Sequence, residues 1–471
     1  MAKRTLILVI CRIMNFGVVI LSPIFMVRLF DVTSYGQYRE FVLYYFLLSV
    51  ILIFSIQTNP IYFISRYPGK ERQTVTHTAL MLLAVSLIGS AAVYLGKGLI
   101  LSRTSYDFIL PLILFIFFNI NLEYYESYCL GRKRADHVLY FSATRAIVRM
   151  IAVIIVAWIT RNIMAVIWTI VFMEIIKCMF VLFASRKLFT RRIELPLFKE
   201  QLRYIVPMGS AAAIERTNTD MAKLVVSSTM GANMLAIYSI GNYQVPIIQV
   251  VRSSIMDVLF PEMTQSDEHD RIVLWKKATI ALCFLVFPLF VVFSWFAKTV
   301  IVTLFTEQYV SAVPIFQIYL TLMLIQCFDM GIPLRAINKT IYFVTGNIVL
   351  LVVNLALIAV LFRLMGIYAP PIAFITGTLV YTMFLAWKTM SIYGLPLPQL
   401  VVWKKLLIII ASCAAGLPVL FAGSMIQMNP VIKAVVFSAI YLGVYLLVIT
   451  RSGIDEVNMM LSKFRKQFKR R

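Results

Sequence analysis

Four ionisable side chains lie in an apolar stretch long enough to cross a membrane. The segment SAAAIERTNTDMAKLVV, residues 210–226, contains Glu215, Arg216, Asp220 and Lys223. The last three are spaced four and three residues apart, so on a helix they share one face, and Glu215 lies one position off it. A charge at the bilayer centre costs about 2.5–3.5 kcal/mol even on lenient scales. Pairing of Arg216 with Asp220 would lower that cost and is one interpretation. Two further charges favour the other, a helix face on a hydrated cavity.

The composition requires that membrane-spanning helices position these residues. Hydrophobic residues make up 61% of the 471 residues and charged residues 14%, against about 45–50% and 25% in soluble domains. The start MAKRTLILVICRIM has basic residues before an apolar run, as a signal peptide would. The apolar run continues to Phe30 without a small-residue cleavage site, so we expect a retained first helix.

Fourteen apolar segments reach the length of about 20 residues that a helix needs to cross the hydrocarbon. They cover residues 6–29, 38–62, 78–98, 107–130, 138–160, 163–185, 204–230, 234–260, 278–297, 311–333, 341–362, 366–387, 405–424 and 430–450. The sequence therefore predicts an all-α polytopic membrane protein with about 14 transmembrane helices.

The basic residues predict the orientation of these helices. With both termini in the cytoplasm, the inner segments hold 29 of the 44 Lys and Arg residues and the outer loops five. Basic loops stay on the cytoplasmic side. The net charge of +23 thus reflects topology and requires no nucleic acid. The six cysteines lie in apolar segments without paired spacing and the three histidines lie in separate loops, so we expect no metal and no cofactor.

The chain is predicted to consist of two six-helix lobes followed by two extra helices. Residues 27–40, VRLFDVTSYGQYRE, weakly match residues 227–240, SSTMGANMLAIYSI, with Tyr38 opposite Tyr238, and each half then reaches a proline. Repeated halves are typical of transporters. The predicted parts are an N-lobe at 1–185, a basic cytoplasmic linker at 186–203, a C-lobe at 204–390, helices 13 and 14 at 391–450, and a basic amphipathic cytoplasmic tail at 451–471.

The turn LFDVTSYGQYREF, residues 29–41, follows a first helix that contains Arg12 and Asn15. It resembles the opening of the Wzx-type polysaccharide flippases, in which a short outer turn ending in Tyr-Gly-x-Tyr joins helices one and two. That family belongs to the multidrug/oligosaccharidyl-lipid/polysaccharide (MOP) exporter superfamily, with the lipid II flippase and multidrug antiporters. The resemblance covers roughly residues 5–400. It implies two six-helix lobes that rock around a central cationic cavity, lined largely by helices one, two, seven and eight. The commoner helix count of twelve leaves the last two helices outside the resemblance.

The implied substrate is a polyprenyl-diphosphate-linked oligosaccharide repeat unit, of the kind used for O-antigen, lipopolysaccharide or exopolysaccharide synthesis. Arginine suits a diphosphate because its planar fork can bond two oxygens and stays charged, and amides suit sugars. The candidate cavity residues are Arg12, Asn15, Asn59, Arg145, Arg149, Arg216, Lys223, Asn242 and Arg252. The candidates for ion coupling are Glu215, Asp220 and Glu174, although Glu174 and Lys177, at i and i+3, also fit a satisfied pair.

We therefore expect a transporter, not an enzyme, in a bacterial inner membrane, with membrane lipids and other polysaccharide assembly proteins as partners. One alternative is a multidrug or other lipid antiporter of the same superfamily, although a cavity of six cations would repel cationic drugs. A second is an integral-membrane glycan polymerase or ligase, which the short outer loops, none above about thirteen residues, disfavour. A third, a non-catalytic scaffold, leaves the mid-helix charges unexplained. No GxxxxGK[ST] loop occurs, which argues against ATP driving transport directly.

Overall fold

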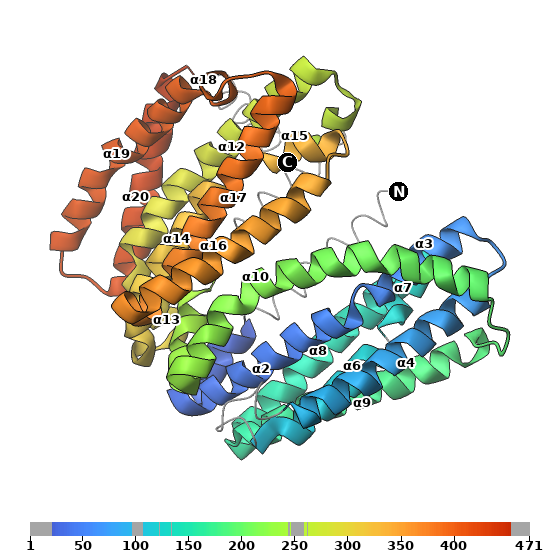
Figure 1. The fold of residues 1–471 in the computed structure, drawn as a ribbon. Helices are drawn as coiled ribbons and strands as arrows, with labels where there is room; N and C mark the ends of the chain where they lie inside the picture. Colours follow the sequence, from blue (N-terminus) through green and yellow to red (C-terminus); the bar gives the residue numbers. More distant parts are fainter. Residues whose placement is uncertain are drawn as a thin grey trace. The chain divides into compact units, whose positions relative to one another are not determined.

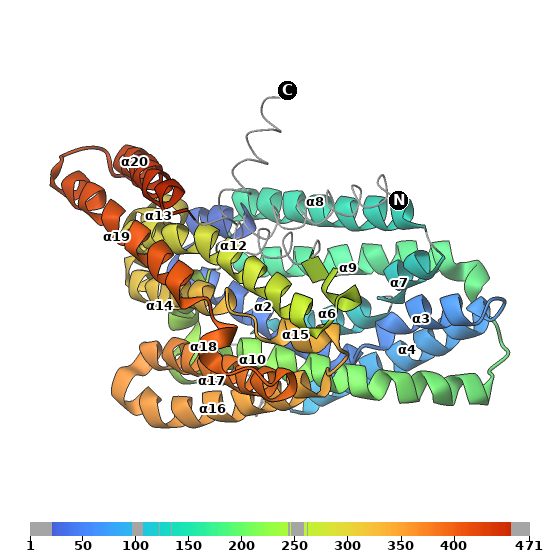
Figure 2. The ribbon, with the colours of Figure 1, turned by 90° about the horizontal axis from the view of Figure 1, so that it is seen from above.

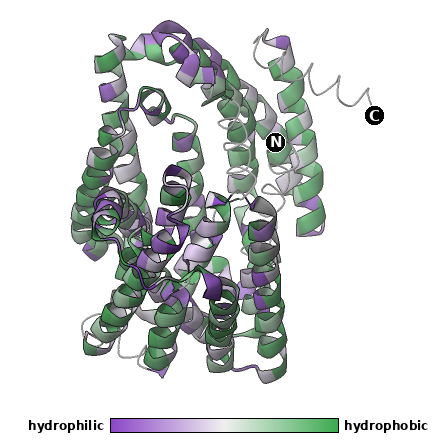
Figure 3. Cartoon of the chain, turned by 90° about the vertical axis from the view of Figure 1, so that its right-hand side faces the viewer, coloured by the Kyte–Doolittle hydropathy of each residue, from purple (hydrophilic) through white to green (hydrophobic). Residues whose placement is uncertain are grey.

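A computed structural model describes residues 21–96, 107–121, 123–132, 134–243, 245, 259–260 and 262–453. These residues form helices joined by short turns, and no β-strand occurs among them. Ten stretches of this described part are long and apolar enough to cross a membrane. The longest, Ile341–Tyr393, contains two helices of 25 residues each. In Figure 3 hydrophobic residues, coloured green, occur along all of the long helices. The predicted all-α polytopic fold with about 14 transmembrane helices is confirmed.

The chain divides into two compact units, Met1–Ser239 and Ile240–Arg471. The helices of the first unit, shown in Figure 1, are α2 (Val32–Ile53), α3 (Asn59–Arg66), α4 (Glu71–Leu95), α6 (Ile109–Asn121), α7 (Tyr124–Gly131), α8 (Ala135–Thr160), α9 (Ile163–Ser185) and α10 (Leu195–Gly241), with the 3-10 turns η1 (Ile56–Thr58) and η3 (Arg186–Leu188). Within this unit α6 packs against α2, α4 and α9, and α8 packs against α9. Charged residues on α8 and α9 can therefore meet.

Several predicted spans consist of two helices in the structure. The span predicted at 38–62 is interrupted after α2, where Phe54 (φ 45°) and Ser55 (φ 60°) adopt left-handed backbone angles, and α3 then begins at Asn59. Pro60 favours this start because a first-turn residue needs no amide donor. The predicted span at 107–130 is likewise divided between α6 and α7.

α10 is longer than either span predicted for its residues. It begins at Leu195 rather than at 204, so the last part of the predicted linker is helical. This first part is held to the unit by polar contacts: Tyr67 Oη donates to Glu200 at 2.9 Å, and the backbone N–H of Glu194 donates to Nε2 of His77 at 3.2 Å. Gly231, at φ 80°, kinks α10 at the boundary predicted between the spans 204–230 and 234–260.

The Tyr-Gly-x-Tyr motif, expected at the end of a turn between two helices, lies inside α2, and its glycine permits a close helix contact. A Cβ on Gly36 of α2 would lie 2.2 Å from the backbone oxygen of Ala232 on α10. No side chain fits at that distance, so glycine is required there. The two segments matched in the sequence repeat therefore pack on each other, and α10 belongs with the first unit up to Ser239. The lobe boundaries predicted from sequence, which assign residues 204–239 to the second lobe, stay predictions.

The second unit contains the remaining helices. They are α12 (Glu268–Trp295), α13 (Ala297–Phe305), α14 (Val313–Gln326), α15 (Gly331–Ala336), α16 (Ile341–Met365), α17 (Ala369–Tyr393), α18 (Leu397–Leu400), α19 (Trp403–Met425) and α20 (Pro430–Arg451), with the 3-10 turns η4 (Glu307–Ala312) and η5 (Gly366–Tyr368). α16 packs along α17, and α19 packs along α20. In Figures 1 and 2 the two helices of each pair lie side by side. Buried Trp275 of α12 donates from Nε1 to the carbonyl of Asp329 at 3.0 Å, which ties α12 to the chain before α15.

Candidate functional site

A network of charged side chains joins α8 and α9 to the turn before α7. The carboxylate of Glu174, which is buried, lies 3.1 Å from Nη2 of Arg145 and 3.3 Å from Nη1 of Arg149. It also lies 3.0 Å from Nζ of Lys177, one turn along α9. Glu123 accepts a hydrogen bond from Lys177 at 2.9 Å and lies 3.6 Å from Arg145. We call these five residues the α8–α9 network.

The α8–α9 network contains three cations and two acids. Glu126 on α7, outside the network, lies within electrostatic range of Arg145 and Lys177 and adds a third acid to their surroundings. A buried charge that loses its partner is strongly destabilising, which explains why each cation here has one. The α8–α9 network therefore fits a structural role at least as well as a role in binding.

Arg216, Asp220 and Lys223 form a separate cluster on α10, which we call the α10 triad. Asp220 is 1% exposed and forms ion pairs with both cations, with Nζ of Lys223 at 3.0 Å from Oδ1 and Nη2 of Arg216 on Oδ2. The side chains of Arg216 and Lys223 are 26% and 19% exposed. One buried carboxylate thus holds two partly exposed cations, and the triad keeps one positive charge in excess.

Two aromatic rings of α2 connect the triad with the network. The guanidinium of Arg216 lies 5.1 Å from the ring centroid of Phe46, a cation–π distance. Tyr45 accepts a 3.3 Å hydrogen bond from Nη2 of Arg149, and the rings of Tyr45 and Phe46 stack with centroids 4.5 Å apart. Charged residues of α8 and α10, far apart in sequence, therefore come together around α2.

The predicted site residues fall into distinct surroundings. The network and the triad contain Arg145, Arg149, Glu174, Arg216, Asp220 and Lys223. Glu215 is exposed and outside the triad. Asn59 is fully buried, and neither atom of its amide has a hydrogen-bond partner among the described residues. Asn242 lies in the second unit, just after α10. Outside the described residues lie Arg12, Asn15 and Arg252.

Glu40 on α2 is a fully buried acid that was not among the predicted site residues. Its carboxylate accepts a 2.6 Å hydrogen bond from Oγ of Ser227 on α10, one turn beyond Lys223. Arg39, next to it, lies within electrostatic range of Lys223. The sequence did contain a signal for this acid, since Arg39 and Glu40 are adjacent opposite charges inside the apolar segment 38–62. α2 therefore contributes one acidic and one cationic side chain to the surroundings of the triad.

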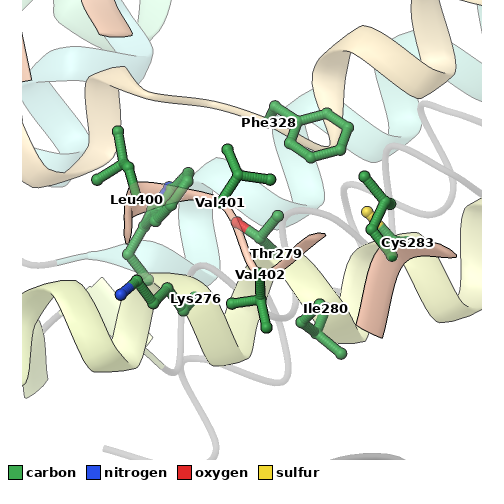
Figure 4. Close-up of a pocket in the computed structure, with 10 residues that line it drawn as sticks. Lys276, Thr279, Ile280, Cys283, Phe328, Leu400, Val401 and Val402 are labelled. Atoms are coloured by element: carbon green, nitrogen blue, oxygen red, sulfur yellow. The ribbon is translucent and has the colours of Figure 1, made fainter. Parts of the chain in front are cut away.

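The described residues offer no metal centre, and one small pocket in the second unit is unsuited to a large ligand. No group of three or more His, Cys, Asp or Glu side chains in the described ranges is placed to hold a metal ion. Figure 4 shows the pocket, whose lining includes Thr279 and Cys283 of α12, Phe328, and Leu400 and Val402 near α18. Its volume of about 10 Å³ has room for about one water molecule.

The fold is that of known membrane transporters. The chain is similar to the lipid II flippase MurJ in an inward closed conformation, with 13% identity and a TM-score of 0.73 over 96% of this chain and 98% of that one. It is similar to an inward-facing multidrug resistance MATE family transporter of the MOP superfamily, with 12% identity and a TM-score of 0.62 over 81% and 94% of the two chains. A MOP superfamily transporter from Pyrococcus furiosus gives 12% identity and a TM-score of 0.57 over 83% and 96%.

Sequence comparison identifies the family. No curated protein sequence matches this chain. Residues 25–314, more than half of the chain, match the family model described as polysaccharide biosynthesis protein. The predicted resemblance to polysaccharide exporters is thereby confirmed: the chain belongs to the polysaccharide biosynthesis protein family.

Proposed function

We propose that this protein is a flippase that moves a polyprenyl-diphosphate-linked glycan from the cytoplasmic to the outer leaflet of a bacterial inner membrane. The α10 triad is the observation that carries this proposal. It places two partly exposed cations and one excess positive charge in the middle of an apolar helix. A charge is expensive to place within a membrane, and charged residues that are kept there usually serve binding or transport. A diphosphate is the anionic group that a lipid-linked glycan would bring to it.

The geometry of the triad suits reversible binding of a diphosphate. Asp220 stabilises Arg216 and Lys223 while no substrate is bound, so the empty site does not contain two bare cations. An arriving diphosphate competes for the same N–H groups, and the arginine fork can bond two of its oxygens. When the cations turn to the substrate, Asp220 is left without its two ion-pair partners. This makes Asp220 our candidate for coupling ion movement to substrate binding.

Family membership and fold support transport of a glycan intermediate in polysaccharide synthesis. The structures similar to this chain include one flippase for a lipid-linked substrate, lipid II. A multidrug resistance MATE family transporter shares the fold, but the excess positive charge of the triad disfavours a cationic drug as substrate. We therefore propose alternating access for an anionic lipid-linked substrate.

The proposal is tested with the purified protein in vesicles that contain a fluorescent polyprenyl-diphosphate oligosaccharide. Movement is measured as the gain in substrate that an external glycosidase can cleave. Replacing both Arg216→Gln and Lys223→Gln should lower the flipping rate at least about tenfold, because two charge-assisted contacts to the diphosphate are lost. Arg28→Gln is the matched control, since Arg28 is exposed and its Nη1 donates to the carbonyl of Ile24 in its own helix.

Two results would refute the proposal. The first is a wild-type flipping rate in the double variant. The second is equal transport by the wild type of a glycolipid whose diphosphate has been replaced by a neutral linkage. A double variant that binds the diphosphate substrate normally but fails to flip it would also exclude the triad as the binding site.

A further inference from the structure

A groove in the first unit is separate from the α10 triad. It has a volume of about 640 Å³ and lies between α8 and α9, with Tyr125 of α7 at one wall. On α8 it is lined by residues on one helix face: His137, Phe141, Thr144, Arg145 and Val148. On α9 it is lined by Met173, Ile176, Lys177 and Phe180, again on one face. Both helices therefore present a continuous surface to the same space.

Cations line this groove, whereas carboxylates do not. Arg145 and Lys177 contribute to its wall, and His137 stands near the start of α8. Their acidic partners Glu123 and Glu174 are absent from the lining, and the Glu174 side chain is only 1% exposed. Glu174 thus lies behind the groove surface, whereas the side chain of Glu123 is 23% exposed and that of Lys177 is 4% exposed. The charged residues in the groove lining are Arg145 and Lys177.

The rest of the lining is apolar and faces the hydrocarbon. Val148, Ile176 and Phe180 are about half exposed, and the last two lie on α9, which is long and apolar enough to span the membrane. Phe141 and Phe180 stack across the groove with ring centroids 5.7 Å apart. A soluble anion would gain nothing from these side chains, whereas the acyl chain of a membrane lipid would pack against them by van der Waals contact.

We propose that this groove binds an anionic glycerophospholipid of the membrane. The lipid phosphate lies by Arg145, Lys177 and His137, and an acyl chain lies along Phe141, Phe180 and Val148. The volume falls within the range of about 300–1,000 Å³ that is usual for small-molecule sites, so the groove has room for part of a lipid. The site is independent of the glycan substrate proposed above, because none of its lining residues belongs to the α10 triad. Bound lipid would stabilise the packing of α8 on α9.

The proposal is tested by native mass spectrometry of the full chain released from nanodiscs. The nanodiscs contain equal amounts of phosphatidylglycerol and phosphatidylcholine, and the bound lipids are counted. The wild type should retain phosphatidylglycerol in preference to phosphatidylcholine. Val148→Trp, which fills the groove while every charged residue is kept, should lower the retained phosphatidylglycerol about tenfold. Ile151→Trp is the matched control, because Ile151 is as exposed as Val148 on the same helix (47% and 48%) but does not line the groove.

Further measurements keep the test decisive. His137→Ala should weaken phosphatidylglycerol retention while leaving the groove open, which separates loss of a hydrogen-bonding side chain from loss of space. If Val148→Trp does not fold, as judged by thermal unfolding, Thr144→Trp fills the same groove from another position. Equal retention of both lipids by the wild type, or wild-type retention in the filled variant, would overturn the proposal.

A final arm distinguishes the source of the phosphate. A polyprenyl phosphate is added to the nanodiscs at the same concentration as phosphatidylglycerol. We expect phosphatidylglycerol to stay bound. If the polyprenyl phosphate displaces it, the groove binds the lipid of the transport substrate instead and the phospholipid assignment is wrong. Loss of flipping in the α10 double variant would leave this result unaffected, so the two proposals fail separately.

Discussion

At the residue scale, the central feature is one buried carboxylate that serves two cations. The spacing of Arg216, Asp220 and Lys223 predicted a shared helix face, and the structure confirms that all three meet. Pairing of Arg216 with Asp220 and a helix face on a hydrated cavity, the two interpretations of the sequence, each describe part of this arrangement. Asp220 neutralises one charge and leaves the other in excess, while both cations keep some exposure.

The triad gives a stability prediction for Asp220→Asn. Removing the buried negative charge leaves two cations side by side, so we expect a loss of about 3–5 kcal/mol in the free energy of unfolding. Adding Lys223→Met to that variant should recover part of the loss, because one of the uncompensated cations is then gone. Thermal unfolding in detergent measures both changes.

The control for this cycle is Glu307→Gln. Glu307 is an exposed acid in η4, and its replacement should change stability by less than about 0.5 kcal/mol. If Asp220→Asn is as mild as the control, or if Lys223→Met makes it worse, the shared carboxylate does not hold the triad together.

The partners in the α8–α9 network were only partly predictable from the sequence. Glu174 and Lys177 are three residues apart on one helix, so local spacing was sufficient to pair them. Glu123 reaches Arg145 and Lys177 from the turn before α7, 54 positions before Lys177 in the sequence. No periodicity within a helix indicates such a contact, because it depends on how α9 packs against its neighbours.

At the element scale, turn chemistry explains where the predicted spans were wrong. Apolar runs indicate that a segment enters the membrane but not that the helix is continuous. The break between α2 and α3 depends on left-handed angles at Phe54 and Ser55, residues with no strong preference for them. The break in α10, by contrast, occurs at Gly231, where glycine made the boundary predictable.

The contact of α2 with α10 gives a prediction for Gly36→Ala. A methyl group at Gly36 would meet the backbone of Ala232, which cannot move aside as a flexible side chain can. We therefore expect Gly36→Ala to destabilise the protein by about 1–3 kcal/mol, as overpacking does. Gly443→Ala is the matched control, since no atom lies within 4 Å of a Cβ at that position in α20. It should be neutral or stabilise by about 0.5–1 kcal/mol. Equal midpoints of thermal unfolding for the two variants would contradict the close packing.

At the scale of the whole molecule, apolar length was sufficient to predict the fold class. Almost every predicted span in the described part of the chain corresponds to one long helix or to a divided pair. This works because a backbone in hydrocarbon must satisfy its hydrogen bonds internally, so a long apolar run has to be helical. Assignment of α10 to a compact unit could not be predicted in the same way, since it depends on side-chain packing against α2 rather than on hydropathy.

The orientation of the chain in the membrane is a prediction that single cysteines can check. The distribution of basic residues puts Glu307 and Met428 on the outer side and Arg191 and Lys339 on the cytoplasmic side. All four side chains are exposed, and the native cysteines in the described residues are buried, so each new thiol should dominate the labelling. In intact cells, a membrane-impermeant maleimide should label the Glu307→Cys and Met428→Cys variants and leave the Arg191→Cys and Lys339→Cys variants unlabelled. Permeabilised cells provide the control, since all four variants should then react. The reverse pattern in intact cells would invert the topology, and with it the direction of transport proposed here.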